Sequence, residues 1–280
     1  RAIRFSAQLG YEIHEDTEAA IRKLAPTLQK ISAERIQVEL TKLLVSPHPD
    51  TLREAYDMGV TKVILPEFDA MMETPQKHKH HKYNVGEHTL HALMRVRPDR
   101  ILRITMLLHD MGKPEYKTMD ETGQAHFKKH AIGSEHIAKE ILKRLKFDNE
   151  TIRIVTRLVL CHDYRMPAEA KNVRKAMNKI GEDIFEYYME VRRADVLAQS
   201  TYLRERKLKN LDDIETLYAK IKEAKQCVSL KELAVSGSDL IAIGIKPGKE
   251  IGEILNRLLE MVIEDPELNQ KEILLKKATI

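Results

Sequence analysis

Apolar residues recur at helical spacing along nearly the whole chain, and this pattern constrains the fold more than any other feature. From Arg35 onward, one helix face carries apolar residues at positions i, i+4, i+7 and i+8. They are Ile36, Leu40, Leu43 and Leu44. A run over residues 251–262 repeats the spacing near the C-terminus. Since no stretch of any length alternates apolar and polar residues as a half-buried strand does, the sequence predicts an all-α fold.

The amino-acid composition agrees with this fold class and indicates where in the cell the protein is expected. Charged residues make up 32% of the 280 positions, aromatic residues 5%, and Trp is absent, which is typical of helix-rich proteins. No apolar run reaches the roughly 18 to 20 residues that a membrane helix needs, and no signal-peptide pattern is present. These features predict a soluble, cytoplasmic protein without a membrane partner. The net charge of +4 permits a nucleic-acid partner without requiring one.

The two cysteines, Cys161 and Cys227, lie far apart and outside any CxxC pair. They are therefore predicted to be buried thiols, not part of a disulfide framework or a zinc finger. Residues that interrupt helices, mainly proline and glycine, divide the chain into residues 1–72, 73–215 and 216–280. The second part opens with a lysine- and histidine-rich stretch over residues 74–82, which we expect to be too polar to pack.

The chemically informative feature is the pair His109 and Asp110, which follows an apolar segment over residues 101–108. That segment is predicted to be a buried helix that stops at Gly112, a residue suited to the position after a helix end. An imidazole and a carboxylate in apolar surroundings are costly unless a cation or a hydrogen-bond network pairs with them. Lys113 follows and could serve as a salt-bridge partner or as a phosphate-binding residue.

Further potential ligands lie in separate helical segments, so packing of several helices could bring one from each to a common point. We call the full set the six candidate ligands: His88, His109, Asp110, His130, His162 and Asp195. Four imidazoles and two carboxylates suit one or two divalent ions of Mn, Fe, Co, Ni, Zn or Mg. Six ligands exceed what one ion with open positions uses. The natural interpretation is therefore two ions that share Asp110, with a hydroxide between them as nucleophile.

The remaining histidines are interpreted as structural. A lone histidine is more often a hydrogen-bonded core residue than a ligand, and this applies to His14, His48, His91, His126 and His136. The tract of His78, His80 and His81 lies among lysines and is interpreted as a solvated loop.

Two segments, YNVGEHTL at residues 83–90 and LLHDMGKP at residues 107–114, resemble the HD superfamily of metal-dependent phosphohydrolases. The minimal signature of that family is matched by His88, His109, Asp110 and Asp195, and the resemblance implies that these four hold one ion. His130 and His162 match the two additional histidines of dinuclear members and would hold the second ion together with Asp110. The resemblance covers residues 83–200 and implies a helical HD domain in which Asp110 and Lys113 are catalytic.

The flanking segments resemble CCA-adding tRNA nucleotidyltransferases and bacterial poly(A) polymerases. Residues 1–13 and 32–40 are similar to their neck, and residues 235–248 are similar to their C-terminal arm. The resemblance implies an HD bundle flanked by a helical neck at 1–72 and an arm at 216–280, with tRNA or other RNA as partner. Arg4 and Arg35 would lie on the nucleotide side; the alternative is that they form helix-surface ion pairs.

The catalytic head of that family has a Gly-Gly-x-Arg loop and a paired-aspartate motif, and neither is in this sequence. We therefore expect a headless portion, to which CTP and ATP addition is not available alone. Two classes of function remain open. The first is a metal-dependent phosphohydrolase that acts on phosphomonoesters or 2′,3′-cyclic phosphodiesters of nucleotides or RNA ends. The second is a non-catalytic tRNA-binding body in which the HD pocket is inherited scaffold.

Overall fold

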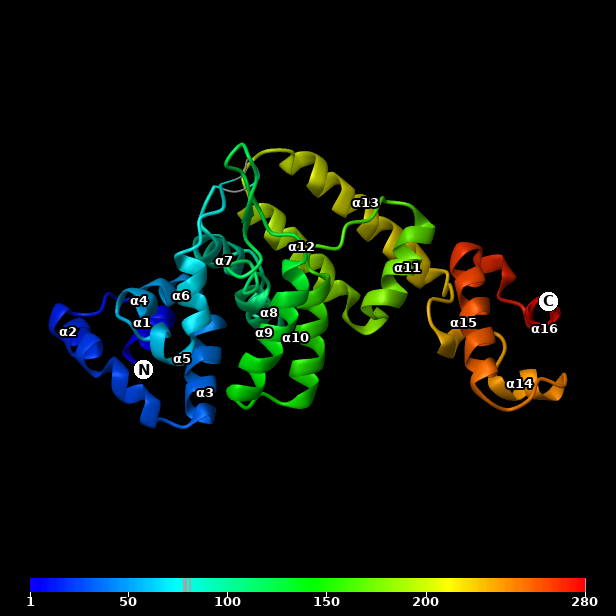
Figure 1. The fold of residues 1–280 in the computed structure, drawn as a ribbon, viewed down its shortest axis with the longest axis horizontal. Helices are drawn as coiled ribbons and strands as arrows, with labels where there is room; N and C mark the ends of the chain where they lie inside the picture. The colour runs from blue at the N-terminus through cyan, green and yellow to red at the C-terminus, as the bar shows by residue number, and fades with distance from the viewer. Residues whose placement is uncertain (78–79, 81, 280) are drawn as a thin grey trace. The chain divides into compact units, whose positions relative to one another are not determined.

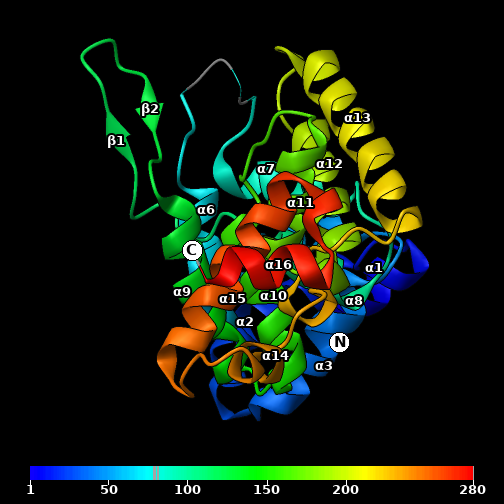
Figure 2. The ribbon, with the colours of Figure 1, turned by 90° about the vertical axis from the view of Figure 1, so that its right-hand side faces the viewer.

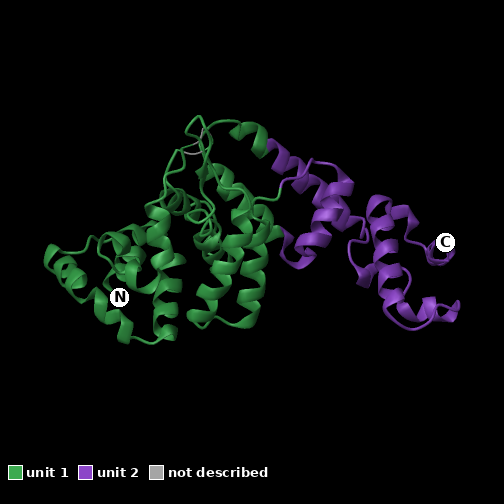
Figure 3. Cartoon of the chain, viewed as in Figure 1, with its two compact units in different colours: residues 1–164, 186–208 green, residues 165–185, 209–280 purple. Residues whose placement is uncertain are grey.

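The computed structural model describes residues 1–77, 80 and 82–279, which form two compact units (Figure 3). The first unit comprises residues 1–164 and 186–208, and the second comprises residues 165–185 and 209–280. The division predicted from the sequence, at 72/73 and 215/216, stays a prediction. Of the lysine- and histidine-rich tract, His78 and His81 lie outside the described residues.

The first unit is built from α-helices with short 3-10 segments between them (Figure 1). The helices that lie wholly within it are α1 (Ala2–Leu9), α2 (Glu15–Leu24), α3 (Ala33–Leu44), α4 (Leu52–Asp57), α5 (Thr61–Ile64), α6 (Pro66–Met72), α7 (Val85–Leu93), α8 (Arg100–Leu108), α9 (His130–Arg144) and α10 (Asn149–Cys161). Its 3-10 segments are Ala25–Lys30 and Pro49–Thr51. Helix α12 (Phe185–Ala198) belongs to it except for its first residue, and α13 (Arg204–Glu223) begins in it.

Side-chain caps explain where the central helices of this unit begin. Asn84, Asp99 and Asp148 accept hydrogen bonds from backbone N–H groups in the first turns of α7, α8 and α10, at 2.7, 3.0 and 2.8 Å. Such caps satisfy donors that have no partner within the helix. The predicted apolar helix over 101–108 is α8, which packs against α10, while α10 packs against α9. These packed helices provide the framework of the site described below.

A small antiparallel ribbon is the only β-sheet among the described residues (Figure 2). Strands β1 (Thr118–Met119) and β2 (Ala125–His126) pair with Thr118 opposite His126 and Met119 opposite Ala125. Two residues a strand are too few to carry a period-two pattern, so the sequence could not indicate them. The prediction of an all-α class is otherwise confirmed. No helix in the described part of the chain is both long and apolar enough to cross a membrane.

The second unit has its own apolar core, which includes the buried free thiol of Cys227. Its helices are α11 (Ala170–Ile180), α14 (Gly237–Ala242), α15 (Lys249–Glu264) and α16 (Lys271–Ala278), with 3-10 segments at Glu182–Ile184, Leu230–Glu232 and Pro266–Leu268, and it contains most of α13. The predicted helix over 251–262 lies within α15. Arg174 on α11 donates hydrogen bonds to the carbonyls of Ile263 (2.7 Å) and Glu264 (3.1 Å), which ties α11 to the last turn of α15.

The polar stretch over 74–82 differs from its prediction, because part of it is packed. Gln76 is only 3% exposed, and its amide nitrogen donates to the carbonyls of Tyr83 and Asn84, both at 3.3 Å. A buried polar side chain is tolerated when it is hydrogen-bonded, and here the partners come from backbone and from Lys113. The expectation that this stretch is too polar to pack was therefore wrong at Gln76.

Candidate metal centre

Two neighbouring helices, α8 and α10, each place a histidine directly after their last residue. His109 is the C-cap of α8 and His162 is the C-cap of α10, and both side chains are buried. The last carbonyl groups of a helix have no partner within it, so side chains near the end can use them. His130 begins α9, His88 lies on α7 and Asp195 on α12. Five separate elements therefore supply the six candidate ligands.

Backbone carbonyls fix the orientation of three of the imidazole rings. In each ring Nδ1 lies within hydrogen-bond distance of the carbonyl three residues earlier, and a carbonyl can only accept, so Nδ1 carries the proton. The remaining nitrogen, Nε2, is then the one with a free lone pair, which is the form that binds metals. The bonds join His109 to Met106 (2.7 Å), His130 to Phe127 (2.8 Å) and His162 to Val159 (2.6 Å).

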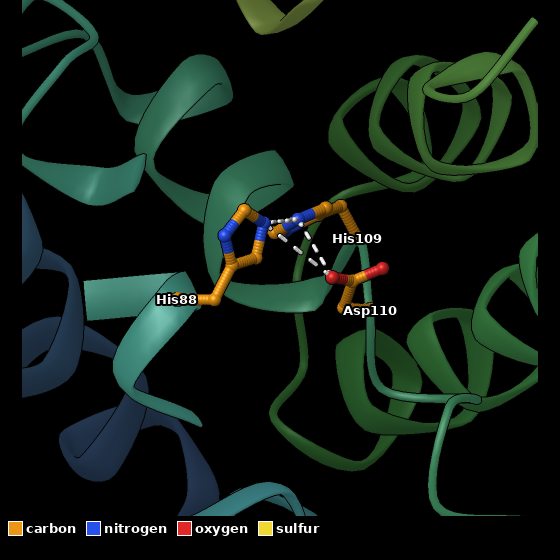
Figure 4. Close-up of side chains that lie close together, drawn as sticks. All are labelled: His88, His109 and Asp110. Atoms are coloured by element: carbon orange, nitrogen blue, oxygen red, sulfur yellow. Dashed lines mark hydrogen bonds and ion pairs between the residues drawn. The ribbon is translucent and has the colours of Figure 1, made fainter. Parts of the chain in front are cut away.

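Asp110 lies at the centre of these rings, and its two oxygens face different histidine pairs. Oδ2 is 3.2 Å from Nε2 of His109 and 3.7 Å from Nε2 of His88. Oδ1 is 3.3 Å from Nε2 of His130 and 3.5 Å from Nε2 of His162. Figure 4 shows the first group, in which the rings of His88 and His109 point toward the carboxylate. Within each group of three residues, two histidines and Asp110, the ligand atoms lie close enough together to hold one ion.

Several atoms in this cluster lack the partners that buried polar groups normally have. Nε2 of His130 and Nε2 of His162 are 3.1 Å apart, and with both protons on Nδ1 their lone pairs face one another. Within the described residues, neither oxygen of Asp110 accepts a well-aligned hydrogen bond, although its side chain is 1% exposed. Ligand atoms bonded to one ion at about 2.1 Å are themselves roughly 3 to 3.5 Å apart. The donor set and its spacing therefore fit divalent cations.

Asp195 joins the same cluster from α12. Its Oδ1 is 3.0 Å from Nε2 of His88, while Oδ2 accepts a 2.9 Å hydrogen bond from the amide of Gln199, one turn later. Arg192, one turn earlier, donates to the carbonyl of His162 at 2.8 Å and lies 3.7 Å from Asp195. A buried guanidinium thus links the end of α10 to the carboxylate on α12.

Lys113 fulfils the salt-bridge role in this structure. Its Nζ is 2.7 Å from Oδ2 of Asp110 and 2.8 Å from Oε1 of Gln76, and the side chain is 6% exposed. A lysine that is buried this deeply needs such partners to offset the loss of water. Gln76 supplies one of them.

The charges in the cluster keep both carboxylates ionised. Burial raises the pKa of Asp110, but His109 and Lys113 outweigh it, so the pKa lies well below its usual range. Burial likewise opposes ionisation of Asp195, and the hydrogen bond and charge of His88 bring its pKa well below the usual range. Burial lowers the pKa of His162, which favours the neutral form. In His109 burial is outweighed by Asp110, which raises the pKa, so a proton on Nε2 must be displaced before that ring binds an ion.

Gly112 has a different role from the one predicted. It does not have the positive φ of a residue that ends a helix in the left-handed region. Instead, a Cβ placed there would lie 2.5 Å from the backbone nitrogen of Ser134 and 2.6 Å from the carbonyl oxygen of His130. Its own N–H donates to the Ser134 hydroxyl at 2.9 Å. The glycine lets the segment after Asp110 approach the start of α9 closely, which positions His130.

The two arginines predicted on the nucleotide side lie apart from this cluster. Arg4 is buried and pairs with Glu39 at 3.0 Å, while Arg35 is exposed. Both border a cavity of about 790 Å³ within the first unit. Most of the histidines interpreted as core residues are exposed, so that interpretation was wrong for them. His14, for example, lies on the surface, where its side chain accepts a hydrogen bond from the backbone N–H of Asp16 at the start of α2.

Sequence reasoning missed three residues that support the centre. Gln199 and Arg192 lie four positions after and three positions before Asp195, and helical spacing alone would place them on its face. Gln76 lies in an irregular segment, where no periodicity indicates which side chains turn inward.

Two family models match the chain. Residues 10–72 match the model described as "Probable RNA and SrmB- binding site of polymerase A". Residues 125–278, more than half of the chain, match the model described as "tRNA nucleotidyltransferase domain 2". The chain belongs to the tRNA nucleotidyltransferase family.

Curated members of this family resemble the chain over most of its length. The CC-adding tRNA nucleotidyltransferase of Thermus thermophilus is 30% identical over 94% of the chain, and the A-adding tRNA nucleotidyltransferase of Deinococcus radiodurans is 29% identical over 93%. The chain spans 62% of the length of each. A crystal structure of the Bacillus stearothermophilus CCA-adding enzyme in complex with CTP matches the whole chain at 20% identity with a TM-score of 0.60, covering 60% of that enzyme. This last likeness shows the fold.

These relatives favour the second class of function considered from the sequence over the first. Each of them is named for nucleotide addition or crystallised with CTP, and none is named as a phosphohydrolase. The resemblance to the tRNA nucleotidyltransferase family is confirmed, whereas the HD superfamily is not among the matched models.

Proposed function

We propose that this chain is an RNA-binding body of a tRNA nucleotidyltransferase, which holds tRNA through its helical surface. The observation that carries the proposal is the pair of family matches, to an RNA-binding site over residues 10–72 and to a nucleotidyltransferase domain over residues 125–278. The net charge of +4 and the exposed Arg35 agree with a phosphate-bearing partner.

Binding of a tRNA that lacks its 3′-terminal CCA, measured by fluorescence anisotropy, tests this proposal. Phosphate contacts release counterions, so the affinity should fall steeply between 50 and 200 mM salt, by about tenfold or more. Arg35→Ala should weaken binding several-fold, whereas Lys139→Ala, an exposed cation on α9, serves as a matched control. Absence of saturable binding at the lowest salt would overturn the proposal.

A second candidate function is hydrolysis of phosphomonoesters or 2′,3′-cyclic phosphodiesters of nucleotides or RNA ends. The observation in its favour is the position of Asp110, each of whose oxygens faces a different pair of histidine Nε2 atoms. In this proposal His88, His109, Asp110 and Asp195 hold one divalent ion. His130 and His162 with Asp110 hold the second.

The residues of the chain would then act as follows. Bound divalent ions supply an activated water at neutral pH and polarise the phosphate. Asp110 and Asp195, which remain ionised, offset the charge of the ions and keep them in place. Lys113 neutralises charge on the phosphate, for which its Nζ must turn from Oδ2 of Asp110 toward the substrate. This function and RNA binding are compatible in one polypeptide.

Release of phosphate from 2′-AMP and 3′-AMP, and opening of 2′,3′-cyclic AMP, tested with Mn, Ni, Co, Zn and Mg in turn, would measure this activity. Asp110→Ala should lower the rate by more than about 10²-fold, since the loss of a group that stabilises the transition state directly is normally at least that large. Asp163→Ala removes an exposed carboxylate next to His162 and is the control. Equal rates for wild type and Asp110→Ala would exclude the candidate.

A further inference from the structure

A cavity of about 450 Å³ adjoins the metal centre through α7 and α12, yet none of the six candidate ligands lines it. The segment before α7, the outer face of α7 and the residues that follow α12 form its wall. We call it the basic pocket and define it by Lys82, Tyr83, His91, Arg95, Gln199 and Arg204. Three of these are cations, and no acidic side chain lines the pocket among the described residues.

Arg204 gives the pocket an unmet hydrogen-bonding requirement. Its Nη2 donates to the carbonyl of Gln199, but Nε is buried and has no acceptor within the described part of the chain. A buried charged donor that lacks an acceptor is costly. Arg204 lines the pocket, so a turn of its guanidinium toward the pocket would let an anionic oxygen there supply the missing acceptor.

Two aromatic rings, those of Tyr83 and His91, lie beside the cations in the pocket wall. Tyr83 and His91 stack with their ring centroids 4.0 Å apart and an interplanar angle of 25°. Nζ of Lys82 lies 5.3 Å from the centroid of Tyr83. Burial lowers the pKa of His91, and the positive charges of Arg95 and Lys82 lower it further, whereas Asp50 raises it. Cations beside aromatic rings are the combination that binds phosphate and base in single-stranded nucleic acids.

From this geometry we infer that the basic pocket binds the phosphate of a single nucleotide unit, either a free nucleotide or the end of an RNA strand. Its volume is in the range of small-ligand sites and too small for a duplex. The inference does not depend on metal binding or on hydrolysis. Gln199 connects the two regions, since it lies in the pocket wall and its amide donates to Asp195 at 2.9 Å.

Calorimetric titration with AMP, and separately with a hexa-adenylate, tests this inference on the full chain. Lys82→Ala and Arg95→Ala should each weaken binding by roughly tenfold, as expected for the loss of a charge-assisted contact. Both side chains are exposed, so the variants should fold, which circular dichroism verifies. Arg157→Ala, an exposed arginine on α10 outside the pocket, is the matched control.

The two probes distinguish the source of the phosphate. Hexa-adenylate binding much more tightly than AMP identifies an RNA end, and equal affinities identify a free nucleotide. Addition of EDTA should leave the affinity unchanged, because no candidate metal ligand lines the pocket. The inference is overturned if neither probe binds at about 1 mM, or if binding is abolished by EDTA and unaffected by Lys82→Ala and Arg95→Ala.

Discussion

Lys113 and Gln76, 37 residues apart in the sequence, are joined by a 2.8 Å hydrogen bond from Nζ to Oε1 in the buried interior of the first unit. The same Gln76 side chain donates to the carbonyl of Asn84, the residue that caps the helix bearing His88. One glutamine therefore connects the lysine beside Asp110 to the start of α7. This connection makes the segment before α7 part of the centre.

Gln76→Met should lower the free energy of unfolding by about 1 to 3 kcal/mol. The variant keeps the side-chain volume but leaves the buried ammonium of Lys113 with one acceptor fewer. Urea denaturation followed by circular dichroism measures the change. Gln29→Met, at an exposed position, should leave the midpoint within error, and an equal midpoint for both variants would contradict the assigned role of Gln76.

Protein purified without chelator should contain one or two divalent ions per chain by elemental analysis. Removal of the ions should lower the melting temperature, because a ligand that binds only the folded state stabilises it. Asp110→Ala should bind less metal, since this carboxylate faces both histidine pairs. A chain that stays metal-free after incubation with Mn or Ni would argue against the centre.

Asp148→Ala should destabilise the protein by about 1 kcal/mol at neutral pH, because Asp148 caps α10, the helix that ends at His162. Hydrogen bonds to the backbone and side chain of Thr151 lower the pKa of Asp148 from 3.8 to about 2. Its ionised form therefore stabilises the fold above about pH 4, and the contribution is lost as the pH falls through about 2.

Denaturation of the Asp148 variants between pH 2 and pH 7 measures this dependence. The difference between wild type and Asp148→Ala should shrink toward pH 2. Asp148→Asn, which retains a capping oxygen without a charge, should differ less from wild type at neutral pH. A constant difference across the range would show that ionisation of Asp148 does not contribute.

Gly112→Ala should lower the free energy of unfolding of the first unit by at least about 1 to 3 kcal/mol, since the added Cβ would clash with backbone atoms of Ser134 and His130. It should also weaken metal binding, because His130 would be displaced. Gly252→Ala is the matched control: it lies within α15 with open space around it and should be neutral or stabilising. Destabilisation of equal size in both variants would refute the close-approach argument.

The helices were predicted correctly, and the candidate ligands were proposed, from features that are local in the sequence. The apolar face of α8 and the pair that follows it are readable from spacing, and each candidate ligand falls on or at the end of a helix. Features that depend on contacts between distant segments were not readable. Gln76 lies in a segment without periodicity, Gly112 is needed because α9 approaches it, and the ribbon around residue 120 is too short to have a pattern.

The three rings whose Nδ1 atoms are held by helix-end or turn carbonyls have a consequence for how the centre assembles. Their orientation is set by main chain, so it is inherited from folding and not from the arrival of an ion. The metal centre should then accept different divalent cations without rearrangement, so which ion it holds would depend on which ions the surroundings offer. Metal uptake would also report on fraying of the last turns of α8 and α10, since loosened carbonyls release the imidazoles to rotate.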